Sequence, residues 1–342
     1  MKILAARLIA ACIIFLPLSQ VYCQTIKIGT LAPDGSTWYR ALRDMGKEWE
    51  RVTAGKVKIK IYPGGVAGDE VDMVRKMRIG QLHAAAITNF GLSSIIPEIK
   101  AFEMPMIFNS YEELDYVRDK LAPKQEELLG SKGFLVLYWG DAGWAHMFSQ
   151  KPVIFPQDLK TQDQKIFVWA GATESFKAWK AAGFHPVEVA APDIFMSLQT
   201  GLINAFTTTP LIALSYQWFA LAKNMCDFAY APLCGATIIT KEKWEQIPAK
   251  IQPKLLQAAR LSGERLKKEI RAMDDEAVKV MEKHGLIKHP VPEEARKEWK
   301  DMTEKYLYPE LLAREVPQDI YKEILGFLQE YRTKPSQRPK NE

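Results

Sequence analysis

Two short segments near the start of the chain alternate apolar and polar side chains. Residues 25–29 and 56–61 place their apolar side chains on one face, as a half-buried β-strand requires. Apolar residues recur at helical spacing over 38–52, and a second helix is expected after Asp69, a natural N-cap residue. The continuous apolar run at 84–87 predicts a strand covered on both faces. This order of strands and helices predicts a parallel sheet with crossover helices.

The same pattern returns in the middle of the chain. Residues 134–138 predict another buried strand, and residues 139–151, which carry glycines and aromatics, are expected to connect two lobes. The further elements that we expect in the second lobe are strands over 165–169, 185–189 and 203–207, with helices over 174–182 and 192–200. The sequence therefore predicts an α/β protein with two lobes.

A long amphipathic helix is predicted in the last third of the chain, over about residues 253–284. At 1.5 Å per residue it would be about 48 Å long, more than the ~30 Å diameter of a small domain, so we expect it to lie across both lobes. The predicted organisation is lobe I from residues 24–142 plus about 231–252, lobe II from residues 143–230 plus about 286–332, the bridging helix over about 253–284, and a flexible tail over 333–342.

The first 23 residues have the layout of a secretory signal peptide. Lys2 and Arg7 precede an apolar run that is too short to span a bilayer as a stop-transfer helix. We expect cleavage after Cys23 and a periplasmic mature protein. As an alternative, Cys23 becomes a lipidated amino terminus, although the bulky Tyr22 before it fits that processing poorly.

Charge and cysteine content narrow the function classes. The net charge of +5 falls to +3 once the charges of Lys2 and Arg7 are removed, and the basic residues are scattered, which argues against a nucleic-acid partner. Two cysteines follow the signal segment. Cys226 and Cys234 either form a disulfide in the oxidising export compartment or stay as buried free thiols in a core that needs no covalent link.

The sequence contains no recognisable catalytic or metal-binding pattern. Pro63, directly before the glycines at 64, 65 and 68, blocks the dinucleotide-binding fingerprint, so a tight turn is expected there and no dinucleotide site. The five histidines show no metal-ligand spacing, and no G-x-S-x-G elbow is present. The acidic run 274–276 is expected on a solvated helix face. We therefore predict a protein that is not an enzyme and uses no cofactor or metal.

Several segments together carry a family resemblance. In chain order they read IGTLAPDGSTW, YPGGVAGDE, PEIKAFEMPMIF, KPVIFPQDLK and SLQTGLINAFTTTP. With these segments in this order, the chain resembles the extracytoplasmic solute-binding proteins of TRAP transporters, the DctP-like family, over essentially its whole mature length. The resemblance implies a two-lobe periplasmic-binding-protein architecture of type II-like form, a long helix spanning both lobes, closure on a ligand, and delivery to TRAP membrane subunits.

Residues that the family uses to hold a carboxylate are missing at the matching positions. The family writes K-I-R-V where this chain has residues 165–168, so Phe167 stands in place of the usual arginine. Ala145 stands at the second arginine position, and Thr208 or Thr209 at the usual asparagine. Carboxylate recognition is therefore not implied. The chain is most similar to the variety that has a tetratricopeptide-repeat protein as an additional partner.

These replacements predict a small, largely apolar ligand. A buried carboxylate without a cationic partner costs several kcal/mol, whereas an apolar ligand that buries about 300 Å² gains on the order of 7 kcal/mol before other costs. Alternatively, the same aromatic residues are ordinary core. The predicted ligand-binding residues are Phe90, Trp139, Trp144, Phe167, Trp169 and Phe206 as walls, Asn89, Thr207, Thr208 and Thr209 as hydrogen-bonding groups, and Ala145.

Three other functions stay open at this point. A binding protein of the same kind would hold an organic acid through a different cation, the nearest being Lys165 and His146. An exported hydrolase on the same scaffold would need a nucleophile and base that the sequence does not display. A ligand sensor would use the closed form to signal to a partner.

Overall fold

The computed structural model describes residues 24–333. The predicted signal peptide and Cys23 lie outside the described residues, as do residues 334–342 of the predicted tail. Thr333, the first residue of that tail, is the last residue of a helix.

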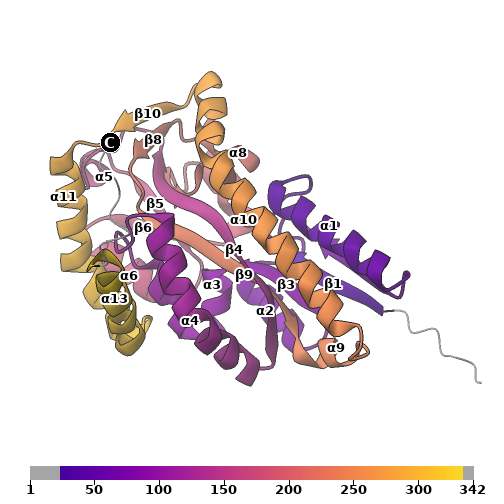
Figure 1. Cartoon of the computed structure of the whole chain (residues 1–342). Coiled ribbons are helices and arrows are strands. Elements are labelled where there is room, and N and C mark those ends of the chain that lie inside the picture. The colour runs from indigo at the N-terminus through magenta and orange to yellow at the C-terminus, as the bar shows by residue number, and fades with distance from the viewer. Residues whose placement is uncertain (1–23, 334–342) are drawn as a thin grey trace, which may run out of the picture.

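A single mixed β-sheet runs through the molecule (Figure 1). Its strands are β1 (Gln24–Thr30), β2 (Val57–Tyr62), β3 (Ala84–Thr88), β4 (Phe134–Ser149), β5 (Lys165–Trp169), β6 (His185–Val189), β7 (Ala205–Thr208), β8 (Asn224–Asp227), β9 (Ala231–Thr240) and β10 (Ile287–Pro290). The order is β2-β1-β3-β9-β4-β7-β5-β6, and β8 pairs with β4 and β10. β1 is parallel to β2 and β3, which confirms the predicted parallel unit. β9 pairs antiparallel with β3 and β4 and makes the sheet mixed.

Helices cover both faces of the first part of the sheet. The helices are α1 (Thr37–Val52), α2 (Glu70–Arg78), α3 (Asn89–Ser93), α4 (Tyr111–Ser131), α5 (Asp158–Thr161), α6 (Thr173–Ala181), α7 (Ile194–Gln199), α8 (Pro210–Ser215), α9 (Lys241–Glu245), α10 (Gln252–Lys283), α11 (Glu293–Met302), α12 (Tyr308–Arg314) and α13 (Gln318–Thr333), with short 3₁₀ helices η1 (Pro97–Glu103), η2 (Ala191–Asp193) and η3 (Trp218–Ala220) and a π turn η4 (Thr303–Leu307). α1 and α10 share one core cluster with Ala84 of β3, and α2 shares another with Ala85. Neighbouring residues of β3 therefore face opposite layers, as the continuous apolar run predicted.

The predicted long helix is confirmed as α10, which has 32 residues (Figure 1). It begins in a core cluster with Trp49 and ends, at Met281, in a cluster with Phe148. A Cβ added at Gly263 would lie 2.7 Å from Tyr138, so glycine lets the helix approach β4 closely. No helix within residues 24–333 combines the length and the apolar character that a membrane span needs. The lobe boundaries stay a prediction.

Strand β4 is longer than the sequence indicated. We expected a strand ending at Tyr138 and then a connection to residue 151, and this prediction is wrong, because the strand continues to Ser149. The glycines that suggested a loop lie within the strand, and Gly140 pairs with Gly235 of β9. Gly143, with φ of +110°, follows a register irregularity. β4 thus lies between β9 and β7, pairing with β9 over residues 134–145 and with β7 over residues 146–149.

Cys226 and Cys234 are free cysteines. Cys226 lies in β8 and Cys234 in β9, and both are buried. Burial raises the pKa of each thiol to about 12, so neither is a reactive thiolate at neutral pH. Of the two alternatives drawn from the sequence, the structure has the free thiols.

Candidate functional site

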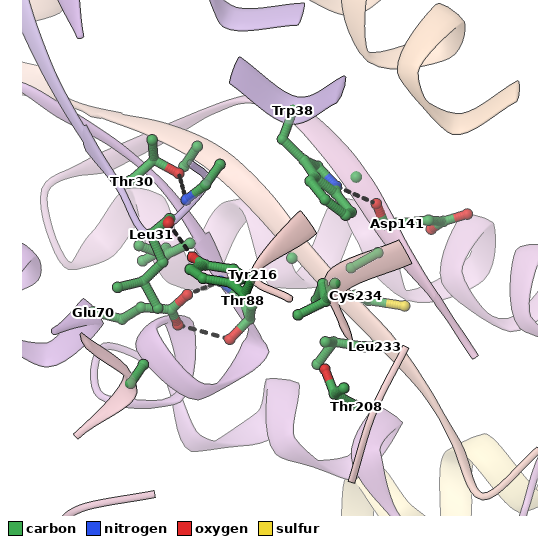
Figure 2. A pocket seen from close by; sticks show the side chains of 18 of the residues that line it. Thr30, Leu31, Trp38, Glu70, Thr88, Asp141, Thr208, Tyr216, Leu233 and Cys234 are labelled. Carbon is green, nitrogen blue, oxygen red and sulfur yellow. Dashed lines mark hydrogen bonds between the residues drawn. The ribbon is translucent and has the colours of Figure 1, made fainter. Parts of the chain in front are cut away.

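A cavity of about 170 Å³ lies where the ends of β1 and β3 meet β4, β5, β7, β9 and helix α8 (Figure 2). Its wall is largely apolar. The aromatic residues that line it are Trp38, Tyr138, Phe167, Trp169, Phe206, Tyr216 and Trp218. A concave, mostly apolar space with a few polar groups is the usual form of a small-molecule site.

Six of the predicted binding residues line this cavity: Ala145, Phe167, Trp169, Phe206, Thr207 and Thr208. Phe167 is 8% exposed and meets Trp169 edge to face, with the ring centroids 5.6 Å apart. Phe206 is also in edge-to-face contact with Trp218 at 5.6 Å. Strands β5 and β7 therefore bring aromatic side chains that are distant in sequence to the same wall.

Two predicted wall residues on β4 lie outside the cavity lining. The Trp139 indole donates a hydrogen bond to Glu126 at 3.0 Å. The ring of Trp144 packs against Tyr111, with centroids 5.5 Å apart. Tyr138 and Ala145, their neighbours in β4, line the cavity. Because successive side chains of a strand point to opposite faces, Trp139 and Trp144 point away from it. A ligand-binding role for these two residues stays a prediction that the geometry does not support.

Three further predicted residues belong to helix starts behind the wall. Thr209 is the N-cap of α8 and accepts a hydrogen bond from the Ile212 amide. Asn89 and Phe90 form the first turn of α3, and both are buried. Phe90 stacks on Trp169 with centroids 4.6 Å apart, so it supports a cavity residue from behind. Their predicted contact with ligand likewise stays a prediction.

Glu70 is a polar group of the cavity that the sequence reasoning missed. Its carboxylate accepts hydrogen bonds from the Thr88 amide at 2.9 Å, the Thr88 hydroxyl at 2.7 Å and the Gly91 amide at 2.9 Å. Figure 2 shows Glu70 and Thr88 on the same side of the cavity as Tyr216, whose hydroxyl donates to the Leu31 carbonyl. Burial raises the pKa of Glu70 from 4.5 to about 7, although these hydrogen bonds oppose the shift.

A Glu70→Gln variant should flatten the dependence of stability on pH. Because the folded pKa of about 7 exceeds the ordinary 4.5, the folded state holds a proton that the unfolded chain has released, and stability is lost as pH rises from about 4.5 to 7. Glutamine does not titrate, so the free energy of unfolding of the variant should fall by about 3 kcal/mol less over this pH range than that of the parent protein. Urea unfolding at several pH values measures the difference. Burial also raises the pKa of Glu103 to about 7 and of Asp274 to about 6, so a residual slope should persist. An unchanged slope would contradict the prediction.

No basic side chain lines the cavity among the described residues. The alternative cations are occupied elsewhere, since Lys165 donates to the Gly201 carbonyl at 3.1 Å and His146 contacts the Cys226 carbonyl at 3.2 Å. Asp141 presents its backbone carbonyl to the Trp38 indole, and its carboxylate points away from that ring (Figure 2). Glu70 is therefore the principal ionisable group of the wall.

Asp274 is not on the solvated helix face that we expected. It accepts hydrogen bonds from the Trp144 amide at 3.4 Å and the Tyr111 hydroxyl at 3.3 Å, and burial raises its pKa to about 6. For Asp274 the prediction was wrong, because α4 and β4 cover α10 at this point, which helical periodicity alone does not reveal; Asp275 and Glu276 are exposed, as expected. Within residues 24–333, no group of three or more histidine, cysteine or acidic side chains is arranged to hold a metal ion.

The curated proteins that the chain is similar to include solute-binding proteins of other bacteria. The chain is 25% identical over 197 residues to a solute-binding protein of Roseobacter denitrificans, covering 56% of this chain and 59% of that protein. It is 23% identical over 262 residues to the C4-dicarboxylate-binding periplasmic protein DctP of Rhodobacter capsulatus, covering 74% and 76%. It thus spans less than two thirds of the first relative's length.

Solved structures show the same fold. A TRAP periplasmic solute-binding protein from Sulfurospirillum deleyianum, solved with bound succinate, superposes with a TM-score of 0.80 at 21% identity, covering 88% of this chain and 97% of that one. The model of the family described as bacterial extracellular solute-binding protein, family 7 (DctP), matches residues 28–314. The chain therefore belongs to this family of bacterial extracellular solute-binding proteins.

Proposed function

We propose that this protein is the solute-binding component of a TRAP-type transporter and captures a small, largely apolar molecule in the cavity for delivery to the membrane subunits. One observation carries the proposal: no lysine, arginine or histidine of the described chain lines the cavity, whereas the acidic residue Glu70 does. Phe167 and Ala145 occupy the positions at which the resemblance leads us to expect cations.

The proposed ligand differs from those of named relatives. The Rhodobacter protein is described as binding C4-dicarboxylates, and the Sulfurospirillum structure contains succinate. In this cavity a carboxylate would lose its hydration without gaining a cationic partner, at a cost of several kcal/mol. The Glu70 carboxylate would add like-charge repulsion wherever it is ionised. A neutral ligand avoids both costs.

The volume and the polar groups of the cavity indicate the size and the chemistry of the ligand. An apolar cavity of about 150 Å³ holds one benzene molecule, so a volume of about 170 Å³ suits a guest of at least one aromatic ring. The polar atoms of Thr207, Thr208 and Glu70 offer hydrogen-bonding partners at the wall. We therefore propose an apolar body with one hydroxyl or amide group as the ligand chemistry.

Native mass spectrometry of protein purified without refolding is the direct test. We expect a neutral guest to co-purify and, after its removal, benzyl alcohol to give saturable binding by calorimetry while succinate gives none. The reason is that transfer of apolar surface into the cavity gains about 25 cal/mol per Å², whereas succinate finds no counter-charge. Recovery of a dicarboxylate from the native protein would overturn the proposal and favour an organic-acid binder.

We further propose export and an additional partner. The predicted signal peptide supports a mature chain beginning at Gln24, which amino-terminal sequencing of the secreted protein tests. The absence of arginine at positions 145 and 167 supports, through the resemblance, association with a tetratricopeptide-repeat protein. Co-expression with such a protein from the same gene cluster, followed by co-purification, tests that association.

A further inference from the structure

A second cavity of about 130 Å³ lies between η1, α6 and the segment formed by η4 and α12. It is distinct from the first cavity, because Phe90 lies between residues of the two. One side of the Phe90 ring stacks on Trp169 of the first cavity wall, and Lys100 of the second cavity wall lies 5.9 Å from the ring centroid. The apolar part of the second wall includes Trp179, Leu311 and Val316.

The polar part of this wall contains the Glu103 carboxylate and the Lys100 ammonium. Glu103 makes no ion pair within the described chain, whereas the neighbouring Lys100 is paired with Glu315 at 2.7 Å. Glu315 also accepts hydrogen bonds from the Glu174 amide and the Ser175 hydroxyl, so it holds Lys100 in a satisfied cluster. Burial raises the pKa of Glu103 to about 7, with Lys100 opposing the shift and Glu315 adding to it. Charge compensation at Glu103 is therefore incomplete.

A buried hydroxyl without a well-formed hydrogen bond lies in the same wall. Tyr230 is 7% exposed, and the polar neighbour of its hydroxyl is the Thr303 hydroxyl; neither makes a hydrogen bond of ordinary geometry among the described residues. The Tyr230 ring stacks on Trp179, with centroids 6.4 Å apart and an interplanar angle of 27°. Buried polar groups are paired in most native structures, so an unpaired one that lines a cavity indicates a missing partner.

We propose that this second cavity binds a small organic cation, with one primary ammonium group and a short apolar chain. The ammonium would donate hydrogen bonds to the Glu103 carboxylate and the Tyr230 oxygen, and it would lie beside the aromatic rings, which attract cations. The chain would contact Leu311 and Val316. An anion would meet the Glu103 carboxylate and find the Lys100 ammonium of the wall already paired with Glu315, and a neutral molecule would leave Glu103 without an ion pair.

The test uses n-butylammonium chloride as probe and the full mature protein, with 1-butanol and butyrate as a neutral and an anionic comparator of similar size. We expect calorimetry to show saturable butylammonium binding at least about tenfold tighter than that of either comparator. Glu103→Gln should weaken it about tenfold and Tyr230→Phe roughly threefold. Glu98→Gln, which changes a carboxylate of the same 3₁₀ helix that does not line the cavity, should leave it unchanged.

Other results would overturn the proposal. Equal binding of 1-butanol would show that the charge of Glu103 is not recognised, and absence of saturation at about 50 mM probe would show that the cavity holds no such ligand. Loss of binding in Glu70→Gln with retention in Glu103→Gln would place the amine in the first cavity. Thermal melting of each variant verifies folding, and Tyr230→Phe keeps the proposal testable if Glu103→Gln does not fold.

Discussion

Phe167→Arg is expected to lower the affinity for benzyl alcohol by about a hundredfold or more, because it places a guanidinium in an apolar wall. Phe167 is 8% exposed and contacts Trp169, so the change also removes an aromatic surface from the ligand. The measurement is calorimetric titration at constant pH. Phe195→Arg is the matched control, since Phe195 is 39% exposed in α7 and does not line the cavity.

Adding Ala145→Arg to Phe167→Arg should begin to admit succinate. Both positions line the same cavity, so two guanidinium groups would face one ligand and each can bind a carboxylate through two hydrogen bonds. Succinate binding, undetectable in the parent protein, should become measurable in the double variant. If the folded double variant keeps the ligand preference of the parent protein, the missing cations do not explain which ligand the site binds.

Local patterns predicted most of the individual elements. Residues 165–169 and 185–189 are strands with the expected bounds, and α10 differs from the expected helix by one residue at each end. Pairing between distant segments was not predictable in this way. The glycines at 140 and 143 indicated a loop, and only their pairing with residues 231–240 keeps them within a strand.

The site was predicted in part. The resemblance directed attention to Phe167, and its strand does line the cavity. Glu70 was missed, although the sequence contained a usable signal. It precedes Met73, Val74 and Met77 by three, four and seven positions, so a charged residue lies on the apolar face of α2. A charge at such a position is buried when the helix packs, which is the reason for its raised pKa.

A buried ion cluster connects α10 to α4 and β4. The Asp141 carboxylate, whose side chain is 1% exposed, accepts hydrogen bonds from Arg118 at 2.5 Å and from Arg271 at 2.9 Å. Asp115 of α4 pairs with both arginines and with Lys267. Two carboxylates thus pair with three cations, and Asp141 lies deepest in the cluster.

Asp141→Asn should therefore destabilise the protein by about 3 kcal/mol, at the lower end of the range for breaking a buried pair, because Asp115 still compensates part of the charge. Urea unfolding at pH 7 measures the change. Asp44→Asn is the control, since its carboxylate is 53% exposed and its pairs with Arg43 and Lys47 lie at the surface; it should change stability by less than about 1 kcal/mol.

Combining Asp141→Asn with Arg271→Met should cost at least about 1 kcal/mol less than the sum of the single changes, because the second change removes a cation left without its partner. Simple additivity would show that Asp141 and Arg271 are not coupled, and the cluster would then not be what holds α10 against β4.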